Sequence, residues 1–141
     1  MKEEKILAVI DTNVLVSALL DHDRESNPSI VLNNILSGKI LPLFNDEILS
    51  EYRDVLSRDK FPFRDCDIED TLCLFQKKGI RVDSTVPVLE DFPDLDDVVF
   101  YEVAMSTEGA YLVTGNIKHF PINTIVVTPA QMVDILLDIK S

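Results

Sequence analysis

Three acidic residues that lie far apart in the chain stand where they could share one site. The first, Asp11, directly follows the apolar run Ile6–Ile10, which predicts a strand buried on both faces. Thr12 and Asn13 then offer caps for a following helix. A carboxylate at such a junction lies at the edge where open α/β sheets bind ligands. An isolated Asp there can equally be a simple helix cap, so its assignment depends on other acids reaching the same edge.

Glu51 is the second acid. It lies three residues after Ile48 and four before Val55, and this helical spacing places Glu51 on the same inner face as these two apolar residues. A glutamate on an inner face is costly unless it is paired, hydrogen-bonded or bound to a metal. The position of Glu51 therefore predicts a functional side chain.

Asp97 is the third acid, and it ends a stretch in which five of eight residues, 90–97, are acidic. Charges at this density repel one another unless water or a cation relieves the repulsion. We expect Asp97 in the first turn of the next helix, near the strand edge, and Asp94 and Asp96 closer to its cap and loop. A very soluble loop is the alternative interpretation.

Several converging oxygen ligands, without His or Cys, suit Mg²⁺ or Mn²⁺ better than zinc. Such a cation would attract phosphate into an acidic cleft, activate water and neutralise charge at a phosphodiester. The sequence contains no Walker loop, GxGxxG motif, nucleophile elbow or HExxH motif. It therefore predicts a divalent-metal site on an α/β sheet.

The elements that would position these acids alternate along the chain. Apolar runs predict strands at 6–10, 39–44, 80–83, 110–114 and 124–127, with helical patterns between them, although Pro42 weakens the second strand. Such alternation predicts an α/β fold with a mainly parallel sheet and helices on both faces. The length of 141 residues, without a linker or repeat, predicts a single domain over 1–141.

The charge balance restricts the ways in which the chain could bind nucleic acid. With 25 acidic and 13 basic residues, the net charge of −12 argues against a broad electrostatic grip on a phosphate backbone. A local basic patch with interleaved Phe61 and Phe63 could still contact RNA, although a solvated helix end explains it equally well. The candidate RNA-binding residues are Arg53, Arg58, Lys60 and Arg64.

Two further features bear on the cellular compartment. Cys66 and Cys73 match no metal or redox spacing, and we expect Cys73 to be a small core residue. Residues 1–5 carry no net positive charge, and Asp11 interrupts the apolar run behind them. We therefore expect neither a signal peptide nor a membrane span, and a cytoplasmic location.

Four motifs, taken together, resemble those of PIN domains. They are Val9-Ile10-Asp11-Thr12-Asn13-Val14, Glu51 within residues 48–56, the acidic segment 94–100 and Tyr111-Leu112-Val113-Thr114-Gly115-Asn116. The resemblance covers nearly the whole chain and is closest to the toxin components of bacterial and archaeal toxin–antitoxin pairs. It implies a three-layer α/β/α fold around a parallel sheet of about five strands. It also implies a Mg²⁺- or Mn²⁺-dependent ribonuclease that forms a homodimer and has an antitoxin partner.

The resemblance assigns roles to the acids by position. Asp11, Glu51 and Asp97 match the three principal acids of the family, which hold the metal and its water. Asn116 stands where many members have a fourth Asp, and an amide oxygen brings no charge to a second metal. Asp94 and Asp96 are candidate ligands that would compensate.

Three polar neighbours, Thr12, Asn13 and Thr114, could orient these acids through hydrogen bonds, and ordinary capping explains them as well. Asn116 and the acidic charge favour an alternative function, a catalytically weak PIN-like module that binds RNA or an antitoxin. A phosphatase of the haloacid-dehalogenase type is a third interpretation. It would need a second Asp two residues after Asp11, where this chain has Asn13.

Overall fold

The computed structural model describes residues 4–140, with side chains described as far as residue 138. The strands are β1 (Ile6–Ile10), β2 (Ile40–Phe44), β3 (Ile80–Arg81), β4 (Tyr111–Val113) and β5 (Val126–Val127). The α-helices are α1 (Thr12–Leu20), α2 (Asn27–Leu36), α3 (Asp46–Leu56), α4 (Asp65–Lys78), α5 (Val98–Met105) and α6 (Pro129–Lys140). Two short 3₁₀ helices are η1 (Leu95–Asp97) and η2 (Ile117–His119).

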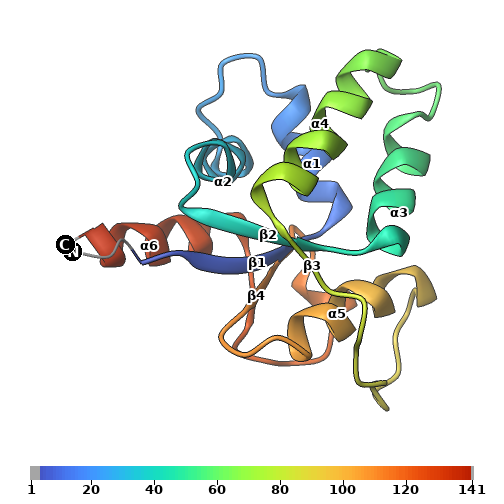
Figure 1. Ribbon diagram of the computed structural model, residues 1–141, viewed down its shortest axis with the longest axis vertical. Helices are drawn as coiled ribbons and strands as arrows, with labels where there is room; N and C mark the ends of the chain where they lie inside the picture. Colours follow the sequence, from blue (N-terminus) through green and yellow to red (C-terminus); the bar gives the residue numbers. More distant parts are fainter. Residues whose placement is uncertain (1–3, 141) are drawn as a thin grey trace.

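The strands form one sheet in the order β3-β2-β1-β4-β5, and every neighbouring pair is parallel. Helices α1 to α4 lie on one side of this sheet and α5 lies on the other, while α6 packs beside α2 (Figure 1). The predicted α/β class with a parallel, five-stranded sheet is therefore confirmed. Within residues 4–140, no helix is long and apolar enough to span a bilayer.

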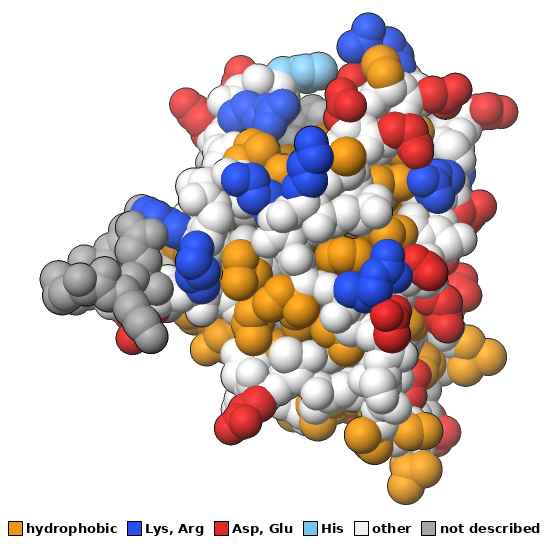
Figure 2. All heavy atoms as spheres, viewed as in Figure 1, with side chains coloured by type: hydrophobic (Ala, Val, Ile, Leu, Met, Phe, Trp, Pro, Cys, Tyr) orange, Lys and Arg blue, Asp and Glu red, His pale blue; other side chains and the backbone are white. Residues whose placement is uncertain are grey.

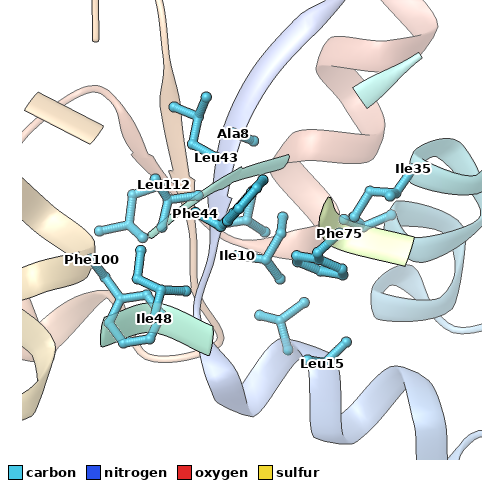
Figure 3. Packing of buried hydrophobic residues seen from close by; sticks show 14 of the residues in the cluster. Ala8, Ile10, Leu15, Ile35, Leu43, Phe44, Ile48, Phe75, Phe100 and Leu112 are labelled. Carbon is cyan, nitrogen blue, oxygen red and sulfur yellow. The ribbon is translucent and has the colours of Figure 1, made fainter. Parts of the chain in front are cut away.

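The core fills both faces of the central strands. Figure 3 shows Phe100, Ile48 and Leu112 gathered on one side of β1, and Phe75 with Ile35 on the other. All five side chains are fully or almost fully buried. Because β1 is covered on both faces, its sequence is an unbroken apolar run, as expected for an inner parallel strand.

Pro42 lies inside β2, which is not an edge strand. The Lys39 carbonyl accepts a hydrogen bond from β1, whereas the Phe44 carbonyl accepts one from Val82 next to β3. Backbone groups alternate in direction along a strand, so the nitrogen of Pro42 faces the β3 side. Pairing with β3 begins only at Leu43, and the missing N–H of Pro42 therefore interrupts no ladder.

The expectation that Cys73 belongs to the core was wrong, because this side chain is exposed. The buried residues of α4 are Ile68, Thr71, Leu72 and Phe75. Cys73 follows Leu72 by one residue, about 100° around the helix, and so faces away from the buried stripe.

Tyr52 joins the sheet to α3. Its side chain is fully buried between the rings of Phe75 and Phe100, and its hydroxyl donates a hydrogen bond to the carbonyl of Ile10 at the end of β1. This bond fixes α3, which carries Glu51, against the end of the strand that carries Asp11.

We expect Tyr52→Phe to lower the free energy of unfolding by about 1–2 kcal/mol, because the buried Ile10 carbonyl loses its donor while the packing stays. Thermal denaturation measures the loss. Tyr111→Phe is the matched control, since Tyr111 is half-buried and its hydroxyl makes no hydrogen bond within the described residues. Equal stability of the two variants would show that the Tyr52 hydroxyl does not hold α3.

Candidate active site

A cleft of about 320 Å³ opens where β1 and β4 end, between α1, α3 and the beginning of α5. The register brings these strand ends together, because Ile10 pairs with Val113. Figure 2 shows acidic side chains along the side of the molecule that carries α3 and the start of α5. The acids that line the cleft are Asp11, Glu51, Asp94, Asp96 and Asp97.

Asp11 lies deepest among these acids and is only 7% exposed. Its carboxylate accepts a hydrogen bond of 2.7 Å from the hydroxyl of Thr114, the residue that follows β4. Burial raises the pKa of Asp11, and the hydrogen bond from Thr114 offsets part of that rise. The carboxylate is thus held in one orientation but is short of positive charge.

Asp97 lines the same cleft as Asp11. The structure places it in η1, immediately before α5 and not in the first turn of that helix as expected. Its side chain is 14% exposed, and burial, followed by repulsion from Asp11 and Asp94, raises its pKa to about 6. Its Oδ2 atom is buried and has no hydrogen-bond partner in the described part of the chain.

Glu51 reaches the cleft from α3 and is half-buried, as its helical spacing predicted. Burial raises its pKa, and repulsion from Asp96 and Asp54 adds to the rise. Asp94 caps η1 through a 3.0 Å hydrogen bond from the backbone N–H of Asp96. These acids therefore influence one another's ionisation, which requires them to be close in space.

The other polar residues that were predicted at the site differ in whether they contact the three acids. Asn13 accepts a hydrogen bond from the N–H of Gly115 at 3.2 Å, and this contact joins α1 to the end of β4. The Thr12 hydroxyl is buried without a hydrogen-bond partner among the described residues. Asn116 is not one of the described residues that line the cleft. Of this group, Thr114 alone forms a side-chain hydrogen bond with one of the three acids.

His119 belongs to the cleft, although the sequence reasoning did not select it. The Asn116 Nδ2 atom lies 2.9 Å from His119 Nε2, within hydrogen-bond distance. His119 Nδ1 faces Asp97 Oδ2 at 3.6 Å, which is too long for a hydrogen bond but close enough for electrostatic attraction. His119 lowers the pKa of both Asp11 and Asp97. The pair of polar residues three apart, Asn116 and His119, was the available signal.

The four candidate RNA-binding cations divide into two pairs. Arg53 forms an ion pair with Glu69 at 2.9 Å, and Arg64 forms one with Asp67 at 3.1 Å. Arg58 and Lys60, in contrast, line the cleft. The structure thus separates two ion-paired cations outside the cleft from two cations that line it, of which Arg58 also pairs with the exposed Asp54 at 3.5 Å.

The donor set of the cleft fits a hard divalent cation. It consists of carboxylate oxygens whose ionisation is opposed by burial and mutual repulsion, and one oxygen of Asp97 lacks a partner. Within the described residues, however, no three His, Cys, Asp or Glu side chains are placed so that one ion could contact all of them. Asp11, Glu51 and Asp97 line one cleft without converging on a single point.

A family model described as a PIN domain matches residues 7–118. This range contains all of β1 except Ile6, the whole of β2 to β4 and every acid of the cleft. No curated protein and no solved structure matches the chain.

The raised pKa of Asp97 leads to a prediction about stability. Between the ordinary value of 3.8 and about 6, the folded chain binds a proton at Asp97 that the unfolded chain does not. The contribution of Asp97 to the free energy of unfolding is therefore fully present below pH 3.8 and is lost as the pH rises through about 6. In EDTA at pH 7, we expect Asp97→Asn to raise the melting temperature by about 3 °C, an advantage that shrinks towards pH 4.

Thermal denaturation from pH 4 to pH 7.5 tests this, with Asp59→Asn as a control at an exposed acid. If the melting temperatures of Asp97→Asn and the wild-type chain changed with pH in the same way, folding would not raise the pKa of Asp97.

Proposed function

Because the chain belongs to the PIN-domain family, whose members are commonly nucleases, we propose that it is a divalent-metal-dependent ribonuclease that hydrolyses phosphodiesters in RNA. The observation that carries the proposal is the set of acids in the cleft. Asp11, Glu51 and Asp97 come from three distant segments, line one cleft and all have a raised pKa. Such a cluster has little structural value by itself, because its charges repel.

PIN domains generally use divalent metals, and in this chain Asp11, Glu51 and Asp97 would hold Mg²⁺ or Mn²⁺. Asp94 and Asp96 are the further candidate ligands, since both line the cleft. When bound, the metal would activate water and neutralise charge on the phosphate. Asn116 contacts His119 and lies outside the cleft lining, which favours a metal set built without it.

The protein's own residues would contribute orientation and charge. Thr114 holds Asp11 in place by its 2.7 Å hydrogen bond, and His119 reduces the repulsion between Asp11 and Asp97. Arg58 and Lys60 bring positive charge to the cleft of a chain whose net charge is −12. This local charge supports binding of a phosphate backbone that the whole molecule would otherwise repel.

A second candidate function is a catalytically weak module that binds RNA or an antitoxin. The observation that favours it is the spacing of the acids, since among the described residues no three metal-binding side chains converge on one point. Metal-dependent cleavage separates the two functions.

We expect the wild-type chain to cleave end-labelled single-stranded RNA in Mn²⁺ and not in EDTA. Asp11→Asn, purified in the same way, should lose at least about 100-fold in rate because a principal metal ligand is replaced. Binding of Mn²⁺ without cleavage would support the binding module. Equal cleavage by both proteins would reveal a contaminating nuclease and contradict the site.

We further propose that the protein acts as the toxin of a toxin–antitoxin pair and that it forms a homodimer, as the family resemblance implies. Induced expression in a bacterial host should then slow growth, and expression of Asp11→Asn at the same level should not. Equal growth of the two cultures would contradict the toxin role. An antitoxin partner would be recovered as a protein that restores growth when expressed together with the wild-type chain.

A further inference from the structure

His119 and Asp97 form a pair in the cleft that a site made of carboxylates alone leaves unexplained. Both residues line the cleft, Asp97 at the end of η1 and His119 at the end of η2. His119 Nδ1 lies 3.6 Å from Asp97 Oδ2. The His119 side chain is 48% exposed, so a ligand from solvent can reach its ring, whereas Asp97 Oδ2 is buried and has no hydrogen-bond partner among the described residues.

The distance between these two atoms matches the spacing of two ligands on one metal ion. A separation of 3.6 Å is too long for a hydrogen bond. Imidazole nitrogens and carboxylate oxygens bind Zn²⁺ at about 2.1 Å, so two such ligands lie about 3.4 Å apart when the angle at the ion is tetrahedral. A cation that contacts both atoms would also supply the partner that Asp97 Oδ2 lacks.

Asn116 is placed to orient the His119 ring for this role. Its amide lies 2.9 Å from Nε2, the ring nitrogen that does not face Asp97. Rotation of the amide about its terminal bond exchanges its nitrogen and oxygen, and the oxygen would then accept the Nε2 proton. His119 Nδ1 would carry the lone pair that binds a metal. Metal-binding histidines usually have such an acceptor at their second ring nitrogen.

The position of Asn116 is itself fixed by the site. Its backbone N–H donates a 3.0 Å hydrogen bond to the hydroxyl of Thr114, and this hydroxyl donates to Asp11. The chain that carries His119 is therefore connected by hydrogen bonds to the most buried acid of the cleft. This connection gives Asn116 a role although it does not line the cleft.

We propose that His119 is a nitrogen ligand of the cation in this cleft, together with Asp97, and makes the site selective for divalent transition metals over Mg²⁺. Imidazole suits transition-metal ions, whereas Mg²⁺ takes oxygen ligands. The carboxylates alone, as read from the sequence, do not distinguish Mg²⁺ from Mn²⁺. This inference rests on the proposed metal-dependent function and specifies the class of metal.

The test measures metal binding in the absence of RNA. Isothermal titration of tag-free, chelator-treated protein with Co²⁺ and with Mg²⁺ gives two affinities for each variant. We expect His119→Ala to weaken Co²⁺ binding at least about 10-fold, as when groups that support a metal are removed, and to change Mg²⁺ binding much less. His119→Asp, which offers oxygen in place of nitrogen, should lose the preference for Co²⁺ and keep Mg²⁺ binding.

The sequence contains two histidines, so His22 is an internal control. His22 is exposed and does not line the cleft. Paramagnetic Co²⁺ shifts the ring-proton NMR signals of a coordinated imidazole far outside their ordinary range. We expect such signals from the wild-type chain and from His22→Gln, and none from His119→Gln. Thermal denaturation confirms that each variant is folded.

The outcomes separate this inference from the proposed function. Unchanged Co²⁺ binding by His119→Ala, an equal loss of Co²⁺ and Mg²⁺ binding, or unshifted ring signals in the Co²⁺-saturated wild-type chain each overturns the nitrogen ligand, even if the chain cleaves RNA. A selective loss of Co²⁺ binding with shifted His119 signals supports the ligand, even if the wild-type chain does not cleave RNA and the ribonuclease is thereby removed. A wild-type chain that binds neither metal overturns both.

Discussion

The electrostatic repulsion between buried carboxylates at one edge of the sheet is the constraint on which the site depends. Asp11 is almost buried and Asp97 is 14% exposed; burial raises the pKa of both, and repulsion from Asp11 raises that of Asp97 further. The fold accepts this cost because the parallel strands β1 and β4 end side by side, and the chain leaves both ends at the same edge. The hydrophobic core on both faces of β1 provides the free energy that keeps the strained edge in place.

The same constraint explains why neutral and basic groups surround the acids. Thr114 donates to Asp11, and His119 stands near Asp97, although neither group is an acid of the family pattern. Positive charge at this edge is local, since Arg58 and Lys60 belong to one short segment after α3. A cation in the cleft would complete this compensation. These neutral and basic groups compensate the acids only in part, so a bound cation would be most favourable beside the acids of the cleft.

The strand pattern and the helical spacing of Glu51 were sufficient to predict the parallel sheet and the edge at which Asp11 lies. Both follow from local periodicity, which a single sequence contains. Asp97 was placed in the first turn of a helix and lies in η1, because one turn of 3₁₀ geometry leaves no periodic signal. The position of Cys73 was missed because its neighbour Leu72 occupies the buried stripe of α4.

The ion pair between Arg53 and Glu69 was beyond prediction for a different reason. It depends on a contact between two side chains whose directions only the folded chain determines. Arg53 and Glu69 are 16 residues apart and lie on different helices, so no spacing rule joins them. The four cations therefore formed one patch in the sequence and two separate groups in the structure. Of the four, Arg58 and Lys60 are the two that line the cleft.

The sheet ends in two very short strands, β3 and β5, each of two residues. Such edges expose few unpaired backbone groups, so they give a neighbouring chain little opportunity to extend the sheet by backbone hydrogen bonding. Assembly with a second copy or with another protein is therefore left to helices and loops, where side chains determine the contact. The topology that brings the acids together therefore also limits association through the edges of the sheet.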